Sequence, residues 1–161
     1  MNADFTNFLD RAKPLGVLYV DVYPYAYTES GELEFLLFRR LPSVVMPGQW
    51  QPICGKINKE ERISEAFHRQ VAKKTGLPPI ELFKIDYVNI FYDDYYDTVM
   101  FVPSAACEVG REVTLDTSLH DDAKFVKPSQ LTEYGLFDAQ LHAYDILQAT
   151  LAKRKQHLHK A

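Results

Sequence analysis

The 161-residue sequence has few cysteines, no excess of basic residues and no long hydrophobic run. Its two cysteines, Cys54 and Cys107, are far apart and fit no metal-binding or redox spacing, so we interpret both as buried thiols of a cytoplasmic protein. The net charge of −4 argues against a broad nucleic-acid or membrane surface, because both need clustered basic residues. No apolar stretch approaches the roughly 20 residues that span a bilayer, and the first residues lack the pattern of a signal peptide.

What remains is the composition of an ordinary globular domain. Hydrophobic residues make up 47% of the chain and charged residues 25%, so we expect a folded core and no disorder. The length suits one domain, which we place over residues 1–161 with an N-terminal extension at 1–14.

Residue periodicity predicts a chain in which strands and helices alternate. Runs rich in β-branched and aromatic residues predict strands over residues 16–27 and 33–40, near 50–54, twice within 80–109 around an acidic turn at 93–97, and over 123–128. Apolar residues at helical spacing predict helices over 4–12, 61–75 and 137–156, and Gly76 stands where a helix C-cap is expected. This order favours an α/β sandwich.

Residues 55–77, GKINKEERISEAFHRQVAKKTGL, carry a recognisable spacing. Gly55 is followed by five residues and Glu61, then by seven residues and Arg69, and Gly76 closes the segment. This spacing resembles the Nudix box, and flanking segments resemble family members that act on pterin or nucleoside polyphosphates. The resemblance covers roughly residues 15–150 and implies the Nudix-type α/β/α sandwich with a mixed β-sheet.

The resemblance implies a chemistry whose acidic residues are missing here. Family members cleave a phosphoanhydride bond with Mg²⁺ or Mn²⁺, which the glutamates of the box helix hold. This chain has Gln70, Lys73 and Lys74 at those positions, and Leu119 where a later acid belongs. A charged ammonium group cannot ligate a metal, so we expect no firm metal site, and only Glu61 and Glu65 as ligands if one exists.

Candidate roles follow from the matching positions. Glu61, Arg69 and Gln70 are the catalytic candidates of the altered box, and Gly55 and Gly76 are its structural positions. Cationic side chains pair with phosphate, and aromatic rings stack on bases. The candidates for phosphate binding are therefore Arg39, Arg40, Lys73 and Lys74, and those for ligand stacking are Trp50 and Tyr92. The alternatives are that Lys73 and Lys74 are solvated surface residues and that the aromatic residues pack the sheet edge.

Three functions remain open at this point. The first is a Nudix-fold protein, impaired in hydrolysis, that binds a nucleotide-type diphosphate without metal. The second is an active pyrophosphatase that cleaves a nucleoside or pterin polyphosphate with relocated Mg²⁺ or Mn²⁺ ligands. The third is a scaffold domain without a ligand, and a homodimer is compatible with all three.

Overall fold

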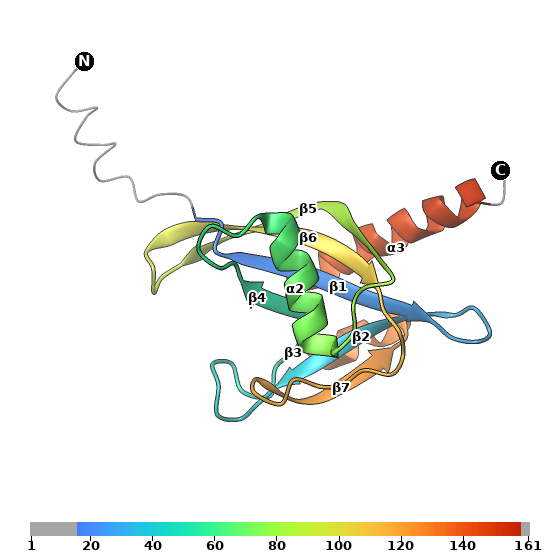
Figure 1. Cartoon of the computed structure of the whole chain (residues 1–161), viewed down its shortest axis with the longest axis horizontal. Coiled ribbons are helices and arrows are strands. Elements are labelled where there is room, and N and C mark those ends of the chain that lie inside the picture. The colour runs from blue at the N-terminus through green and yellow to red at the C-terminus, as the bar shows by residue number, and fades with distance from the viewer. Residues whose placement is uncertain (1–15, 159–161) are drawn as a thin grey trace, which may run out of the picture.

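The computed structural model describes residues 16–158, so the helix predicted over 4–12 lies outside the described residues. One mixed sheet lies between helices that cover its two faces (Figure 1). The α/β sandwich predicted from the sequence is confirmed. Within residues 16–158, no helix is both long and apolar enough to cross a membrane.

The described chain forms a seven-stranded sheet in the order β3-β2-β1-β6-β5, in which β4 also pairs with β1, and β7 with β2. The pairing of β1 with β6 is parallel, whereas β1 pairs antiparallel with both β2 and β4. The strands are β1 (Tyr19–Tyr27), β2 (Leu33–Arg40), β3 (Trp50–Gln51), β4 (Ile53–Lys56), β5 (Glu81–Asp93), β6 (Thr98–Glu108) and β7 (His120–Val126).

Helix α2 (Ile63–Thr75) covers one face of the sheet, and both its ends follow from local chemistry. At its start, the Glu65 carboxylate accepts a hydrogen bond from the Arg62 backbone N–H at 3.0 Å. At its end, Gly76 takes a left-handed conformation with φ of 69°, and its N–H donates to the Ala72 carbonyl. The predicted C-cap glycine is confirmed.

The opposite face is covered by the 3₁₀ helix η1 (Pro128–Tyr134) and by helix α3 (Asp138–Leu158). Strand β1 is buried on both faces, because alternate side chains enter different hydrophobic clusters. Val20 and Val22 pack on the α2 side, and Tyr23 and Tyr25 pack on the α3 side. The sheet is therefore the central layer of the core.

The observed elements differ from the predicted ones at a few boundaries. Strand β7 begins at His120 rather than at residue 123, because it pairs with β2 as far as Arg40 despite two aspartates of low strand propensity. Pro128 opens η1, which was not predicted. Cys54 and Cys107 are both free thiols, and Cys107 is buried whereas Cys54 is half-buried.

Candidate functional site

The loop before α2 is held by a bidentate ion pair. The Arg69 Nε and Nη2 atoms lie 2.6 and 2.7 Å from the two carboxylate oxygens of Glu61. The same carboxylate accepts the Asn58 backbone N–H at 2.8 Å, and Arg69 donates to the Lys56 carbonyl. The hydrogen bonds from Arg69 and Asn58 lower the pKa of Glu61 to about 2. The two residues thus clamp the loop on the helix, as the family resemblance implies.

Gln70 lies directly over Gly55, which explains why position 55 is glycine. A Cβ atom added to Gly55 would lie 2.0 Å from Cδ of Gln70, far inside van der Waals contact. Gln70 is buried, and its Nε2 donates to the Lys56 carbonyl at 2.9 Å. The amide at this box position is therefore used to hold the backbone of β4 against α2.

Lys74 is the most unexpected side chain of the box, because it is buried. Only 2% of its surface is exposed, and its Nζ lies 3.7 Å from Oδ2 of Asp116. Burial lowers the pKa of Lys74, and the negative charge of Asp116 opposes that shift. The alternative that Lys73 and Lys74 are both solvated surface residues is wrong for Lys74, whereas Lys73 is exposed.

A further buried polar side chain, that of His120, lies near this ion pair on the α2 side of the sheet. His120 faces Phe38 and lies 3.3 Å from Gln51, measured between the two Nε2 atoms. Burial, and then the positive charges of Lys74 and Arg40, lower the pKa of His120 to about 4. His120 is therefore neutral at pH 7 and adds no charge to the site.

This arrangement does not fit a Mg²⁺ or Mn²⁺ ion. Such ions need several oxygen ligands, but position 74 directs an ammonium group into the interior. The two carboxylates that could have substituted are already used, Glu61 by Arg69 and Glu65 by the helix N-cap. In the part of the chain that the structure describes, no three His, Cys, Asp or Glu side chains gather around a common point.

The candidate phosphate-binding residues lie on two sides of the sheet. Arg40 and Lys74 share the α2 side, where the positive charge of each lowers the pKa of His120. Arg39 instead pairs with Asp121 at 2.7 Å and lies 5.6 Å from the centre of the Trp50 ring, which packs on the α3 side. The structure therefore brings Arg40 and Lys74 together and places Arg39 elsewhere.

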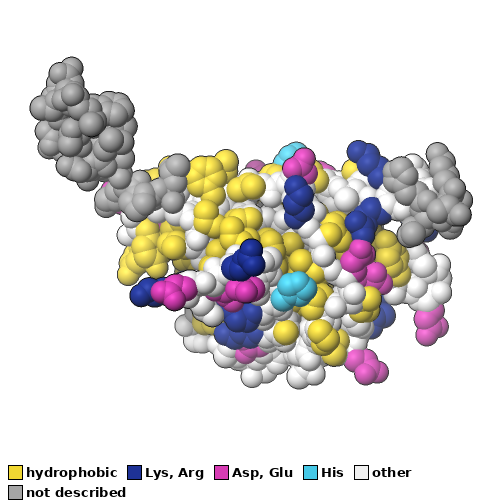
Figure 2. All heavy atoms as spheres, turned by 45° about the horizontal axis from the view of Figure 1, so that its top comes forward, with side chains coloured by type: hydrophobic (Ala, Val, Ile, Leu, Met, Phe, Trp, Pro, Cys, Tyr) yellow, Lys and Arg dark blue, Asp and Glu magenta, His cyan; other side chains and the backbone are white. Residues whose placement is uncertain are grey.

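The two candidate stacking residues are also apart. Trp50 has Arg39 and the Lys124 ammonium over its ring, and Tyr134 contacts it edge-on with centroids 5.3 Å apart. Tyr92 lies in the β5–β6 hairpin, is 62% exposed and donates its hydroxyl to Asp97 at 2.9 Å. Figure 2 shows hydrophobic side chains gathered on the left of that view, over the hairpin end of the molecule.

Sequence reasoning missed one residue that defines this site, Asp116. Nothing in the spacing of the box indicates a partner 42 positions beyond Lys74, because the pair is formed across the fold. Hydrogen bonds from Ser118, followed by the charges of Lys74 and Lys73, lower the pKa of Asp116. Asp116 is therefore an ionised carboxylate opposite a buried cation.

Comparisons with known proteins agree with this architecture. The NUDIX domain family model matches residues 19–149. Solved structures with a similar fold include a Listeria monocytogenes protein proposed to be a NUDIX hydrolase, with a TM-score of 0.74, 19% identity, and coverage of 88% of this chain and 97% of that chain. The NUDIX domain of Shewanella oneidensis NrtR, complexed with ADP ribose, has a TM-score of 0.70 and 18% identity over 94% of this chain and 99% of that chain. A Caenorhabditis elegans Ap4A hydrolase has a TM-score of 0.69 and 17% identity over 86% and 99%. No curated protein sequence gives a significant match.

Proposed function

The chain belongs to the NUDIX family, and we propose that it binds a nucleotide-type diphosphate without a divalent metal and is impaired in hydrolysis. The observation that carries this proposal is the buried Lys74–Asp116 ion pair at a position where the family pattern has a glutamate. An ammonium group at this position removes the carboxylate charge that would repel a diphosphate, while Asp116 balances its own positive charge. It cannot supply the activated water that a metal generates, because it has no ligand position for one.

Electrostatics supports a metal-free site of this kind. A carboxylate-lined helix repels a diphosphate unless a metal neutralises it, whereas a helix with lysines attracts it directly. Lys73 is exposed one residue before Lys74, and its charge acts on both Lys74 and Asp116. Arg40 lies on the same side, and its Nε donates to the Val45 carbonyl at 2.5 Å. Within residues 16–158 its other guanidinium nitrogens donate to no further group, so they are available to a ligand.

The proposal assigns different roles to the basic residues. Lys73 and Arg40 contact the diphosphate, whereas Lys74 stays buried with its charge balanced by Asp116. Arg39 and Trp50 lie on the other side of the sheet, so we propose them for a more distant part of the ligand. The similar NUDIX domain of NrtR was solved with ADP ribose, which is such a diphosphate, and that structure guides the choice of probe.

The test is calorimetric titration with ADP-ribose and ATP in EDTA. We expect binding in the absence of metal, about tenfold weaker binding by the Lys73→Ala variant, and unchanged binding by Lys153→Ala, which alters an exposed lysine of α3. Lys73 suits this test better than Lys74, because truncating the buried lysine disturbs the fold.

A parallel phosphate-release assay with Mg²⁺ or Mn²⁺ separates the other two functions. We expect no turnover of ADP-ribose or ATP. Metal-dependent turnover that is lost in Gln70→Ala would instead identify an active hydrolase with rearranged ligands. Absence of both binding in EDTA and turnover would identify a scaffold domain.

A further inference from the structure

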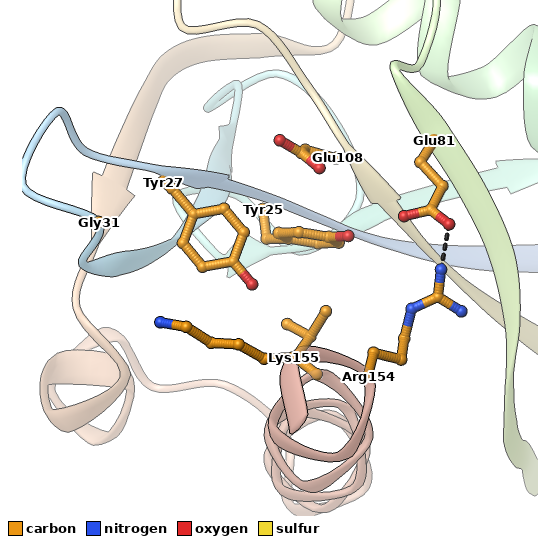
Figure 3. A pocket seen from close by; sticks show the side chains of 8 residues that line it. Tyr25, Tyr27, Gly31, Glu81, Glu108, Arg154 and Lys155 are labelled. Carbon is orange, nitrogen blue, oxygen red and sulfur yellow. Dashed lines mark hydrogen bonds and ion pairs between the residues drawn. The ribbon is translucent and has the colours of Figure 1, made fainter. Parts of the chain in front are cut away.

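We infer that a cavity on the α3 side of the sheet binds a small zwitterion whose ammonium and carboxylate lie at opposite ends of an apolar body, such as an aromatic ring. The cavity has a volume of about 520 Å³ and lies between the end of β1, the paired ends of β5 and β6, and the last turns of α3 (Figure 3). This volume falls within the range of about 300–1,000 Å³ that is usual for small-molecule sites. None of its lining residues belongs to the altered box.

Two acidic side chains face each other at one wall of the cavity. Glu81 and Glu108 are directly opposite across β5 and β6, an arrangement that is unfavourable between like charges. Arg154 from α3 forms an ion pair with Glu81 and lies over the Phe83 ring. Glu108 has no ion pair or side-chain hydrogen bond within residues 16–158, so its carboxylate is available to a cationic group.

Two tyrosine rings form the apolar body of the site. Tyr25 and Tyr27 meet edge-to-face with centroids 5.9 Å apart, and Leu151 of α3 completes the apolar lining. Burial, followed by the charge of Glu108, raises the pKa of Tyr25, which places that carboxylate close to the ring. An aromatic ring beside a carboxylate is a favourable environment for an organic ammonium group.

The opposite wall carries the opposite charge. Lys155 extends from α3 toward Tyr27, and in Figure 3 its ammonium group and the Glu108 carboxylate lie on opposite sides of the two rings. Lys155 likewise has no ion-pair partner among the described residues. Opposite charges at the two ends of an aromatic cavity favour a ligand whose own two charges are separated by an apolar body. We assign the ammonium of that ligand to Glu108 and its carboxylate to Lys155.

Three related probes test this assignment by NMR titration. 4-(Aminomethyl)benzoate carries both charges at opposite ends of its ring, 4-methylbenzylamine lacks the carboxylate, and 4-methylbenzoate lacks the amine. We expect 4-(aminomethyl)benzoate to shift the amide signals of Gly31 and Leu151, and each of the other two probes to bind about tenfold more weakly.

Two variants assign the contacts to single residues. Glu108→Gln should weaken 4-(aminomethyl)benzoate binding about tenfold, and Lys155→Gln should make 4-(aminomethyl)benzoate and 4-methylbenzylamine bind equally. Glu112→Gln and Lys153→Gln, which change exposed charges outside the cavity, should leave all affinities unchanged. Absence of shifts at Gly31 and Leu151 with every probe, or unchanged affinity in Glu108→Gln, would overturn the proposal. Neither result depends on whether the protein binds ADP-ribose.

Discussion

Helix α2 contributes the cation to each of two ion pairs, but the two pairs have different surroundings. Arg69, in the middle of the helix, forms a bidentate pair with Glu61 of the preceding loop, and the Arg69 side chain is 33% exposed. At the C-terminal end, Lys74 is 2% exposed and faces Asp116, whose side chain is 16% exposed. The first pair keeps the residue types of the family pattern, and the second replaces an expected carboxylate with a cation.

This difference shows that the structural and chemical parts of the box can be separated. The Glu61–Arg69 pair holds the loop on the helix through hydrogen bonds that involve no metal. The C-terminal half of the helix carries lysines at positions where the family pattern has glutamates, and there Lys74 pairs with Asp116. A fold can therefore retain its loop clamp while the charge at the neighbouring site is reversed.

The largest expected effect is the loss of the buried pair. Lys74→Ala should lower the free energy of unfolding by about 3 kcal/mol, because it leaves Asp116 without its cation and opens a cavity. Chemical denaturation at pH 7 measures the loss. The double variant Lys74→Met/Asp116→Asn, which removes both charges and keeps most of the volume, should recover more than half of it. Equal losses in the two variants would show that the charge pair is not the cause.

The next largest effect is a pH dependence of the free energy of unfolding that arises from His120. Its pKa is about 4 in the folded protein and 6.5 ordinarily, so the unfolded chain binds a proton first as the pH falls. The free energy of unfolding should therefore fall by about 2–3 kcal/mol between pH 6.5 and pH 4 relative to a His120→Asn variant. Denaturation curves of both proteins across this range measure the difference.

The comparison with His120→Asn is necessary because Asp21 titrates in the same pH range and changes the free energy of unfolding in the opposite direction. Burial raises the pKa of Asp21 from 3.8 to about 6, so its contribution to stability is lost as the pH rises through this window. A pH profile that is identical in the wild type and in His120→Asn would contradict the role given to His120.

A smaller effect is expected at the contact between the two halves of the box. Gly55→Ala places a Cβ atom 2.0 Å from Cδ of Gln70, so the Gln70 side chain must leave its hydrogen bond to Lys56. We expect a loss of about 1–2 kcal/mol in thermal or chemical unfolding. Gly31→Ala is not a matched control, because Gly31 has a positive φ, so Gly110→Ala, whose nearest contact is 3.3 Å, serves instead.

The smallest effect is expected at the partly exposed pair of Glu61 and Arg69. The pKa of Glu61 is lowered to about 2, so the stability that its charge contributes is present above its ordinary value of about 4.5 and is lost as the pH falls toward 2. Glu61→Gln should therefore be less stable than the wild type at pH 7, and the two should converge toward pH 2. Urea midpoints at several pH values measure this, and a difference that persists unchanged at pH 2 would contradict it.

Much of the fold could be predicted because its signals are local. Strand β2 occupies the predicted range 33–40, since a short run of apolar and aromatic residues directly after a turn indicates a strand without reference to the rest of the chain. Helix α2 and its Gly76 cap follow from apolar spacing and from the freedom of glycine at positive φ. Strand β7 was predicted too short, because its first residues have low strand propensity and pair only when β2 lies beside them.

The sequence by itself determined the strands, the box helix and the absence of carboxylates at positions 70, 73 and 74, since residue identity and periodicity need no partner. Only the tertiary structure decided that Lys74 is buried against Asp116, that Arg39 and Arg40 lie on different sides of the sheet, and that Glu108 and Lys155 line one cavity. Each of these depends on residues far apart in the chain, and the burial and charge that define them arise only when the sheet brings those residues together.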